Sequence, residues 1–209
     1  GAGFEGVAEA AGPHAEDAEG TAEAERAAGP HAEDAEAARL RRLAAAEARL
    51  DDMRALLDQL FAYAQANDPD LALDLRPVRV LPVLADVLVG QYPAFERQGW
   101  EPHVDFQDEA LLADADPEAL ARIFENLVVN ALRHGVSAPT IEQRGGTVTF
   151  ANEVSDPAAL DVERLFERFY RADVSRTSPG SGLGLAVAAS LAEAMGMRLD
   201  ARLEGATLR

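Results

Sequence analysis

Three glycines occupy alternate positions directly before a run that reads as a helix: Gly180, Gly182 and Gly184, in the stretch SPGSGLGLAVAASLAEAMG. The N-terminus of a helix offers unpaired backbone N–H groups and a partial positive charge, and glycine lets a ligand approach the backbone closely. The spacing is therefore typical of a phosphate-binding loop. Because a glycine pattern alone is weak evidence, a mobile loop before an ordinary buried helix is the alternative at this point.

A second set of polar residues lies on a predicted helix over residues 118–134. The apolar stripe of this helix, which we expect to face a sheet, consists of Leu120, Ile123, Phe124, Leu127 and Ala131. Asn126, Asn130 and Arg133 form a polar stripe beside it, with spacings of four and three. Asparagine is a poor helix former, but a hard cation such as Mg²⁺ uses an amide oxygen as one ligand and phosphates and water as others. The helix therefore points to magnesium-phosphate chemistry.

The elements that would position these residues can be read from residues 76–209. The helix 118–134 has the clearest limits, because Asp116 is a favoured N-cap, Pro117 suits the first turn and Gly135 suits the end. Around it we expect a helix opened by Pro82 within 81–99, strands near 101–106 and 110–115, a hairpin over 139–152 turning at Gly145 and Gly146, a short helix around 161–170, and final strands over 198–203 and 206–209. Helices mixed with antiparallel strands favour an α+β fold, a two-layer sandwich.

Three stretches of this region, in this order and spacing, resemble the N, F and G2 boxes of two-component sensor histidine kinases: ENLVVNALRHG, RLFERFYRAD and GSGLGLAVAASLAEAMG. The resemblance covers about residues 40–209. It implies the GHKL, or Bergerat, ATP-binding fold, in which ATP lies between the N-box helix and a flexible lid closed by the G2 glycines. Three motifs in register are far more specific than the glycine loop alone.

The resemblance implies a role for the polar residues of the N-box helix. Asn130 would coordinate Mg²⁺, and Asn126 would complete the polar face. Arg133 or His134 would lie near the phosphates of ATP. Of the arginines near the F box, Arg171 would contact the γ-phosphate.

The glycine stretch gains a specific interpretation from the same resemblance. Gly180, Gly182 and Gly184, with Leu183 among them, would flank the triphosphate. The phosphate-binding interpretation is therefore preferred over an ordinary mobile loop.

Adenine recognition is the point at which the sequence departs from the family. The family usually has an aspartate in a G1 box, which accepts a hydrogen bond from the adenine amino group and is followed by glycines. The corresponding position, 14 residues before Phe166, is Asn152, and Val154 and Asp156 replace the glycines. Since asparagine still accepts through its carbonyl oxygen, we expect Asn152 to contact the adenine.

An aromatic cluster lies on the predicted short helix 161–170: Phe166, Phe169 and Tyr170. Such rings more often pack in a core, although a hinge for the lid is the alternative. We expect them to be buried.

Residues 1–38 differ in composition from the rest of the chain. Residues 1–36 hold ten acidic residues and one arginine, which gives half of the net charge of −18. Such a segment cannot bury enough apolar surface to offset its ordering entropy. The stretch AGPHAEDAE occurs twice and places His14 and His31. We interpret residues 1–38 as a disordered or loosely helical acidic linker, with metal binding or phosphoacceptance by these histidines as the alternative.

Residues 39–68 predict a long helix with a heptad seam. Its apolar residues follow alternating steps of three and four: Leu43, Ala46, Leu50, Met53, Leu57, Leu60 and Ala64. This spacing is typical of a helix that packs on a partner helix. It resembles the second helix of the family's dimerisation and phosphotransfer bundle, so we expect homodimerisation through residues 40–66. The first helix of that bundle, which carries the phosphoacceptor histidine, is not recognisable in the sequence.

Composition limits the remaining function classes. The net charge of −18 argues against binding to nucleic acid. Without cysteine, disulfides and thiolate metal sites are excluded, and a reducing compartment is the natural setting. No run approaches the length of an apolar membrane span. The chain starts at Gly1 without methionine, so we expect it to be a piece of a longer protein. We expect the cytoplasmic domain of a membrane-bound protein, with membrane contact only through a missing N-terminal region.

These features together predict a fragment of a sensor histidine kinase, with the ATP-binding catalytic domain over residues 76–209. It would bind ATP and Mg²⁺ and, in the intact protein, transfer the γ-phosphoryl group to a histidine for relay to a response regulator. One alternative is a pseudokinase or nucleotide-binding dimeric scaffold without phosphotransfer. Another is a GHKL protein-serine kinase, against which the seam helix argues.

Overall fold

The computed structural model describes residues 30–66, 72–171 and 181–209. Residues 1–29, most of the predicted linker, lie outside this range, and so does Gly180. Helix α2 (Pro30–Ala66) and the domain that follows it are described separately. Within the described residues, no helix combines the length and the apolar character needed to cross a membrane.

Helix α2 is longer than the sequence predicted, because it begins at Pro30 rather than near residue 39. The added turns consist mainly of alanine and glutamate, which are strong helix formers, and proline is well tolerated in a first turn. The large seam residues have about half or more of their surface exposed: Leu43 51%, Leu50 54%, Met53 58%, Leu57 63% and Leu60 51%. A partner helix would cover an apolar seam of this kind.

Two sheets form within the described part of the domain. Strands β1 (Arg76–Arg79) and β3 (Leu112–Ala115) make a small antiparallel pair. The main sheet has the order β2-β4-β5-β7-β6, with β2 (His103–Phe106), β4 (Thr140–Arg144), β5 (Thr147–Glu153), β7 (Thr207–Leu208) and β6 (Leu203–Glu204). The β2–β4 pair is parallel and the other pairs are antiparallel. The predicted strands near 101–106 and 110–115 and the hairpin over 139–152 are confirmed. The strand predicted over 198–203 is wrong in position, because β6 begins only at Leu203, and β7 is shorter than the predicted 206–209. Strand β1 was not expected.

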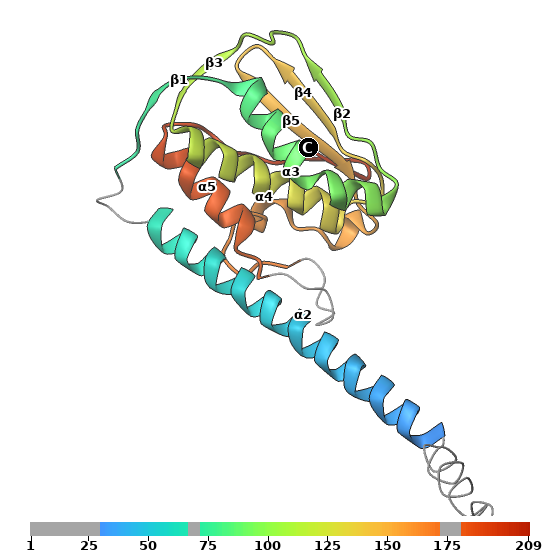
Figure 1. Ribbon diagram of the computed structural model, residues 1–209. Coiled ribbons are helices and arrows are strands. Elements are labelled where there is room, and N and C mark those ends of the chain that lie inside the picture. Colours follow the sequence, from blue (N-terminus) through green and yellow to red (C-terminus); the bar gives the residue numbers. More distant parts are fainter. Residues whose placement is uncertain (1–29, 67–71, 172–180) are drawn as a thin grey trace, which may run out of the picture. The chain divides into compact units, whose positions relative to one another are not determined.

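Three helices form a layer on one face of the main sheet: α3 (Val80–Gln98), α4 (Pro117–His134) and α5 (Gly184–Ala194) (Figure 1). Helix α4 packs against both α3 and α5. Their apolar sides and the sheet share one core, which includes Val80, Leu84, Leu120, Ile123, Phe124, Ile141, Val187 and Leu191. Phe124 of α4 contacts Phe150 of β5, with ring centroids 5.7 Å apart. The predicted two-layer α+β sandwich is confirmed.

Asp116 fixes the start of α4. Its carboxylate accepts hydrogen bonds from the N–H groups of Glu118 at 2.9 Å, Ala119 at 3.0 Å and Asp74 at 3.0 Å. The hydrogen bond from Ala119 is the main cause that lowers the pKa of Asp116 below its usual value. The predicted cap is confirmed, and it also ties residue 74 to the start of this helix.

Substituting Asp116→Ala is expected to lower the free energy of unfolding by about 1–2 kcal/mol, because three N–H groups lose their acceptor. Folding lowers the pKa of this carboxyl, so its charge-dependent contribution is full above the unfolded pKa and is lost as the pH falls through the folded pKa. Asp116→Asn keeps a cap without this titration. In urea unfolding, the stability gap between wild type and Asp116→Asn should narrow in acid. An Asp116→Ala variant as stable as wild type at neutral pH would contradict the assignment.

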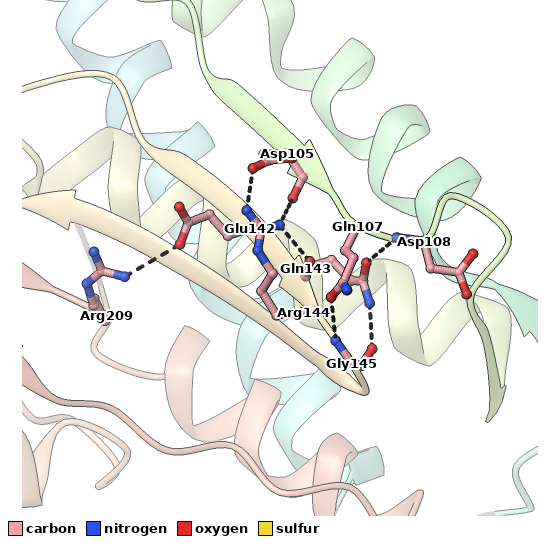
Figure 2. Close-up of polar contacts among 8 residues, drawn as sticks. All are labelled: Asp105, Gln107, Asp108, Glu142, Gln143, Arg144, Gly145 and Arg209. Atoms are coloured by element: carbon pink, nitrogen blue, oxygen red, sulfur yellow. Dashed lines mark hydrogen bonds and ion pairs between the residues drawn. The ribbon is translucent and has the colours of Figure 1, made fainter.

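A polar cluster joins β2 to β4 at one end of the sheet (Figure 2). Gln143 of β4 is fully buried. Its Oε1 accepts a hydrogen bond from the N–H of Asp108 at 2.8 Å, and its Nε2 donates to the carbonyl of Gly145. Asp105 of β2 forms an ion pair with Arg144. The buried amide therefore connects the chain after β2 to the hairpin turn, where Gly145 has the positive φ of 56° that a glycine turn requires.

Residues 161–170 differ from the predicted short helix. A 3₁₀ helix, η2 (Val162–Arg164), is followed by turns. Phe166 and Tyr170 are half-buried, but Phe169 is 65% exposed. Phe169 has a φ of +62°, and a left-handed residue cannot continue a helix that would carry its ring into the core. The core interpretation is therefore wrong for Phe169.

Candidate functional site

A cavity of about 520 Å³ lies between α4, the chain after β5 and the start of α5. This volume is within the usual range for small-molecule sites. The lining includes Asn126, Asn130, Arg133 and His134 of α4, Val154, Ser155 and Asp156 after β5, Tyr170 and Arg171, and Ser181, Gly182 and Gly184. The cavity is thus walled by segments that are far apart in the sequence.

At one end of the cavity, α4 approaches the start of α5 closely. A Cβ atom added to Gly184 would lie 2.7 Å from Oδ1 of Asn126, so a larger residue does not fit without displacement. Nδ2 of Asn126 donates to the carbonyl of Arg122 at 2.8 Å, which fixes the orientation of the amide. The first N–H groups of a helix lack partners within it and form the positive end of its dipole. This end therefore places an amide oxygen beside N–H donors.

Gly182 is held against the chain that precedes the loop. Its φ is 69°, and an added Cβ would lie 2.8 Å from the carbonyl oxygen of Tyr170 and 2.9 Å from backbone atoms of Phe169. The N–H of Phe169 donates to the carbonyl of Gly182 at 3.0 Å. Both the backbone conformation and the lack of space therefore require glycine at this position.

Tyr170 is fixed from two sides where it lines the cavity. Its hydroxyl accepts a hydrogen bond from the N–H of Asp161 at 2.7 Å, and the guanidinium of Arg164 lies 5.1 Å from its ring centroid. Arg164 also donates to Glu167 at 2.9 Å, and this hydrogen bond raises the pKa of Arg164. These contacts fix the ring of Tyr170 where it lines the cavity, as the next residue, Arg171, also does.

The other end of the cavity lies where α4 ends. Gly135 forms a bridge with Val154, and the N–H of Val136 donates to the carbonyl of Glu153 at 3.0 Å. Asn126 and Gly135 are nine residues apart, which corresponds to about 13 Å along the helix axis. The lining here includes the apolar residues Val136, Val154, Ala159, Leu160 and Leu208, and also Arg133 and His134 of the last turn of α4. Amide groups and N–H donors thus mark the end beside Asn126, the polar end. Apolar side chains gather at the other end, the apolar end, which two basic residues of α4 border.

The structure brings most of the predicted site residues together. Those that line the cavity are Asn126, Asn130, Arg133, His134, Arg171, Gly182 and Gly184. Leu183 is buried instead, and its N–H donates to Oγ of Ser181 at 3.1 Å. Asn152, at the end of β5, is 6% exposed and is not among the lining residues that the structure describes. The prediction for Gly180 concerns a residue outside the described range.

Among the lining residues that the sequence analysis missed, four have polar side chains: Ser155, Asp156, Tyr170 and Ser181. Tyr170 was assigned to the core because it lies in an aromatic cluster. Ser181 lies between two predicted glycines and has no pattern of its own. Asp156 carried a usable signal, because it is a carboxylate at a position where the family pattern has glycine.

Substituting Gly184→Ala is expected to weaken nucleotide binding without unfolding the domain. The new methyl group would meet Oδ1 of Asn126, and relieving this contact must move either the amide or the first turn of α5. Calorimetric titration and thermal unfolding of the same variant measure the two effects. Gly90→Ala is the matched control, because an added Cβ there meets nothing within 4 Å. Nucleotide affinity of Gly184→Ala equal to that of the control would contradict the close approach.

Comparisons with known proteins agree with this geometry. Residues 115–209 match the family described as histidine kinase-, DNA gyrase B-, and HSP90-like ATPase. The chain is 27% identical over 166 residues to the sensor histidine kinase YcbM of Bacillus subtilis (strain 168), a match that covers 76% of this chain and 53% of YcbM. It is 32% identical over 168 residues to the signal transduction histidine-protein kinase BaeS of Escherichia coli (strain K12), covering 76% of this chain and 36% of BaeS. The chain therefore spans only part of the length of these relatives.

Solved structures share the fold. The histidine kinase AdeS of Acinetobacter baumannii superposes with a TM-score of 0.64 at 16% identity, covering 79% of each chain. Full-length ShkA, solved in complex with AMPPNP, superposes with a TM-score of 0.65 at 23% identity, covering 80% of this chain and 37% of that chain. The family match itself begins at the end of β3 and includes the cavity-lining segments described above.

Proposed function

We propose that this chain, whose catalytic domain belongs to the sensor histidine kinases of two-component systems, binds ATP with Mg²⁺ in the cavity beside α4. As part of a longer protein, it would transfer the γ-phosphoryl group to a histidine. The observation that carries the proposal is the close approach of Asn126 to Gly184, 2.7 Å from the position of an added Cβ. It places an amide oxygen, which is a suitable ligand for Mg²⁺, next to the start of a helix, where phosphates bind well.

The polar residues that line the cavity suit a magnesium-nucleotide complex. Asn130 lies one turn after Asn126 on the cavity wall, and its amide oxygen is a suitable ligand for Mg²⁺. Arg133, His134 and Arg171 provide side chains that can compensate phosphate charge. When bound, Mg²⁺ neutralises charge on the β- and γ-phosphates. The chain itself contributes positioning and fixed dipoles, which carry most of the catalysis in phosphoryl transfer.

Asn126 supports transfer to a histidine over hydrolysis of ATP. Related GHKL ATPases have a glutamate at this position that activates water, and an amide cannot accept a proton in that way. The amide of Asn126 is also engaged with the carbonyl of Arg122. Asp156 is the acidic residue among the lining residues that the structure describes. It follows β5 at the apolar end of the cavity, so it does not take the place of that glutamate.

The partners follow from the same proposal. The phosphoryl group would pass from the histidine to a response regulator, and two copies of the chain would pair through residues 40–66 of α2. The chain would be the cytoplasmic domain of a longer membrane-bound protein. A pseudokinase or dimeric scaffold is the second candidate, because Asn152 stands where the family has its adenine-binding aspartate and does not line the cavity within the described residues.

Titration with a fluorescent ATP analogue tests the proposal. We expect saturable binding that strengthens when Mg²⁺ is present and that excess unlabelled ATP reverses. A lack of binding would overturn the proposal.

With γ-labelled ATP, we expect no acid-labile label on the chain, because none of its histidines shows the pattern of the family's phosphoacceptor helix. If label appears and is lost in His31→Gln, the acceptor lies in the repeat.

A further inference from the structure

We propose that Asp156 reads the base of the nucleotide, its carboxylate accepting a hydrogen bond from the amino group of adenine. This inference rests on the proposed binding of ATP in the cavity. It concerns a position where the family pattern has glycine, so the recognition would be particular to chains that carry an acid here.

The two ends of the cavity set the direction of the nucleotide. N–H donors and amide groups meet at the polar end, beside Asn126 and Gly184, which suits a triphosphate. Gly135 lies about 13 Å further along the axis of α4. The lining near it includes the apolar Val136, Val154 and Leu208, on which a flat aromatic base can pack, beside Arg133 and His134 of the last turn of α4. The base therefore lies at the end where the chain after β5 passes.

Asp156 belongs to the segment that follows β5, and it lines the cavity. Its Oδ1 accepts a hydrogen bond from the N–H of Ala159 at 3.2 Å and caps the 3₁₀ helix η1 (Pro157–Ala159), which holds the carboxylate in place. Among the described residues, no hydrogen bond engages its Oδ2. An ionised carboxylate only accepts hydrogen bonds, so its complement in a base is an N–H group. The amino group of adenine provides one.

Asn152 is less suited to this contact than Asp156. It is 6% exposed and is not among the described lining residues. Its Nδ2 lies 3.4 Å from the carbonyl oxygen of Glu153, and also 3.4 Å from the position of a Cβ added to Gly135. Asn152 therefore packs beneath the end of α4, whereas Asp156 reaches the cavity.

Two nucleotides that differ only in the amino group isolate the contact. Calorimetry would measure the binding of Mg-ATP and of the magnesium complex of purine riboside triphosphate, which lacks that group. The variant Asp156→Asn keeps the size of the side chain and the cap on Ala159, but turns an amide N–H₂ group towards the donor of the base. We expect it to weaken ATP about tenfold, which corresponds to about 1.4 kcal/mol, and to change the affinity for purine riboside triphosphate less than about twofold.

Asp161→Asn is the matched control. Asp161 caps the neighbouring η2 through the N–H of Glu163 at 3.2 Å and is not among the described lining residues, so both nucleotides should bind it as they bind wild type. Equal weakening of both nucleotides by Asp156→Asn would overturn the inference in favour of a structural role. Tighter binding of both would overturn it in favour of charge repulsion of the triphosphate. An amino-selective loss in Asn152→Ala alone would assign the contact to Asn152. If wild type binds neither nucleotide, the proposed function fails first and the inference fails with it.

Discussion

Replacing Asn130 with alanine is expected to weaken the binding of Mg-ATP at least about tenfold, or about 1.4 kcal/mol, while the fold is retained. Asn130 is half-buried on the cavity wall, one turn after Asn126, and it is the residue proposed to bind Mg²⁺. Removing its amide oxygen leaves the metal one protein ligand short. Calorimetry with and without Mg²⁺ measures the effect, and the loss should be confined to the magnesium complex.

The matched control for this substitution is Glu125→Ala. Glu125 is exposed on the same helix and is not among the described lining residues, so its removal should leave the affinity for Mg-ATP unchanged. Unchanged affinity in Asn130→Ala would rule out Asn130 as a metal ligand. An equal loss with metal-free ATP would instead assign Asn130 to a direct contact with the nucleotide.

Substituting Leu50→Glu together with Leu57→Glu is expected to abolish self-association of the chain. These leucines are 54% and 63% exposed in one copy, and each leucine that a partner helix buries contributes roughly 1.5–3 kcal/mol. Glutamates in the seam would remove this burial and place like charges opposite each other in the dimer. Sedimentation velocity over a range of concentrations should show a dimer for wild type and a monomer for the double variant.

Ala44→Glu with Ala45→Glu is the control for added charge. Both alanines are exposed, and neither belongs to the seam. The control adds two glutamates to the same helix and should still dimerise. A wild-type chain that stays monomeric at high concentration would contradict dimerisation through residues 40–66, and a monomeric control would show that net charge alone prevents association.

The elements of the fold were predictable where local signals define them. Asp116, Pro117 and Gly135 mark both ends of α4 within the sequence itself, and Gly145 marks the hairpin turn. Long-range pairing has no such signal. The parallel pair β2–β4 and the pair β1–β3 join strands that other elements separate in the chain, so periodicity and capping carry no information about either pairing.

The same distinction applies to the site. Asn126 and Asn130 were predictable, because the period of a helix places them on one face. Asn152 shares its strand face with Val148 and Phe150, so the alternation along β5 already indicates that it faces the helix layer. Tyr170 and Asp156 lie outside the helices and strands, next to turns and a short 3₁₀ helix, where no period applies. Only the tertiary structure shows that they line the cavity.

The hydrogen bond between Phe169 and Gly182 joins the two ends of the chain that runs between these residues. The free-energy cost of closing a loop, which comes from lost chain entropy, grows slowly with loop length, by about 0.6 kcal/mol for each doubling. Both anchoring residues have a positive φ, so their junction is defined by their own backbone conformations. A change in the number of residues between Arg171 and Ser181 therefore alters the cost of closing the loop only slightly and leaves the junction itself in place. The backbone of Phe169 and Gly182, and not the length of the chain between them, thus fixes how these two parts of the cavity wall meet.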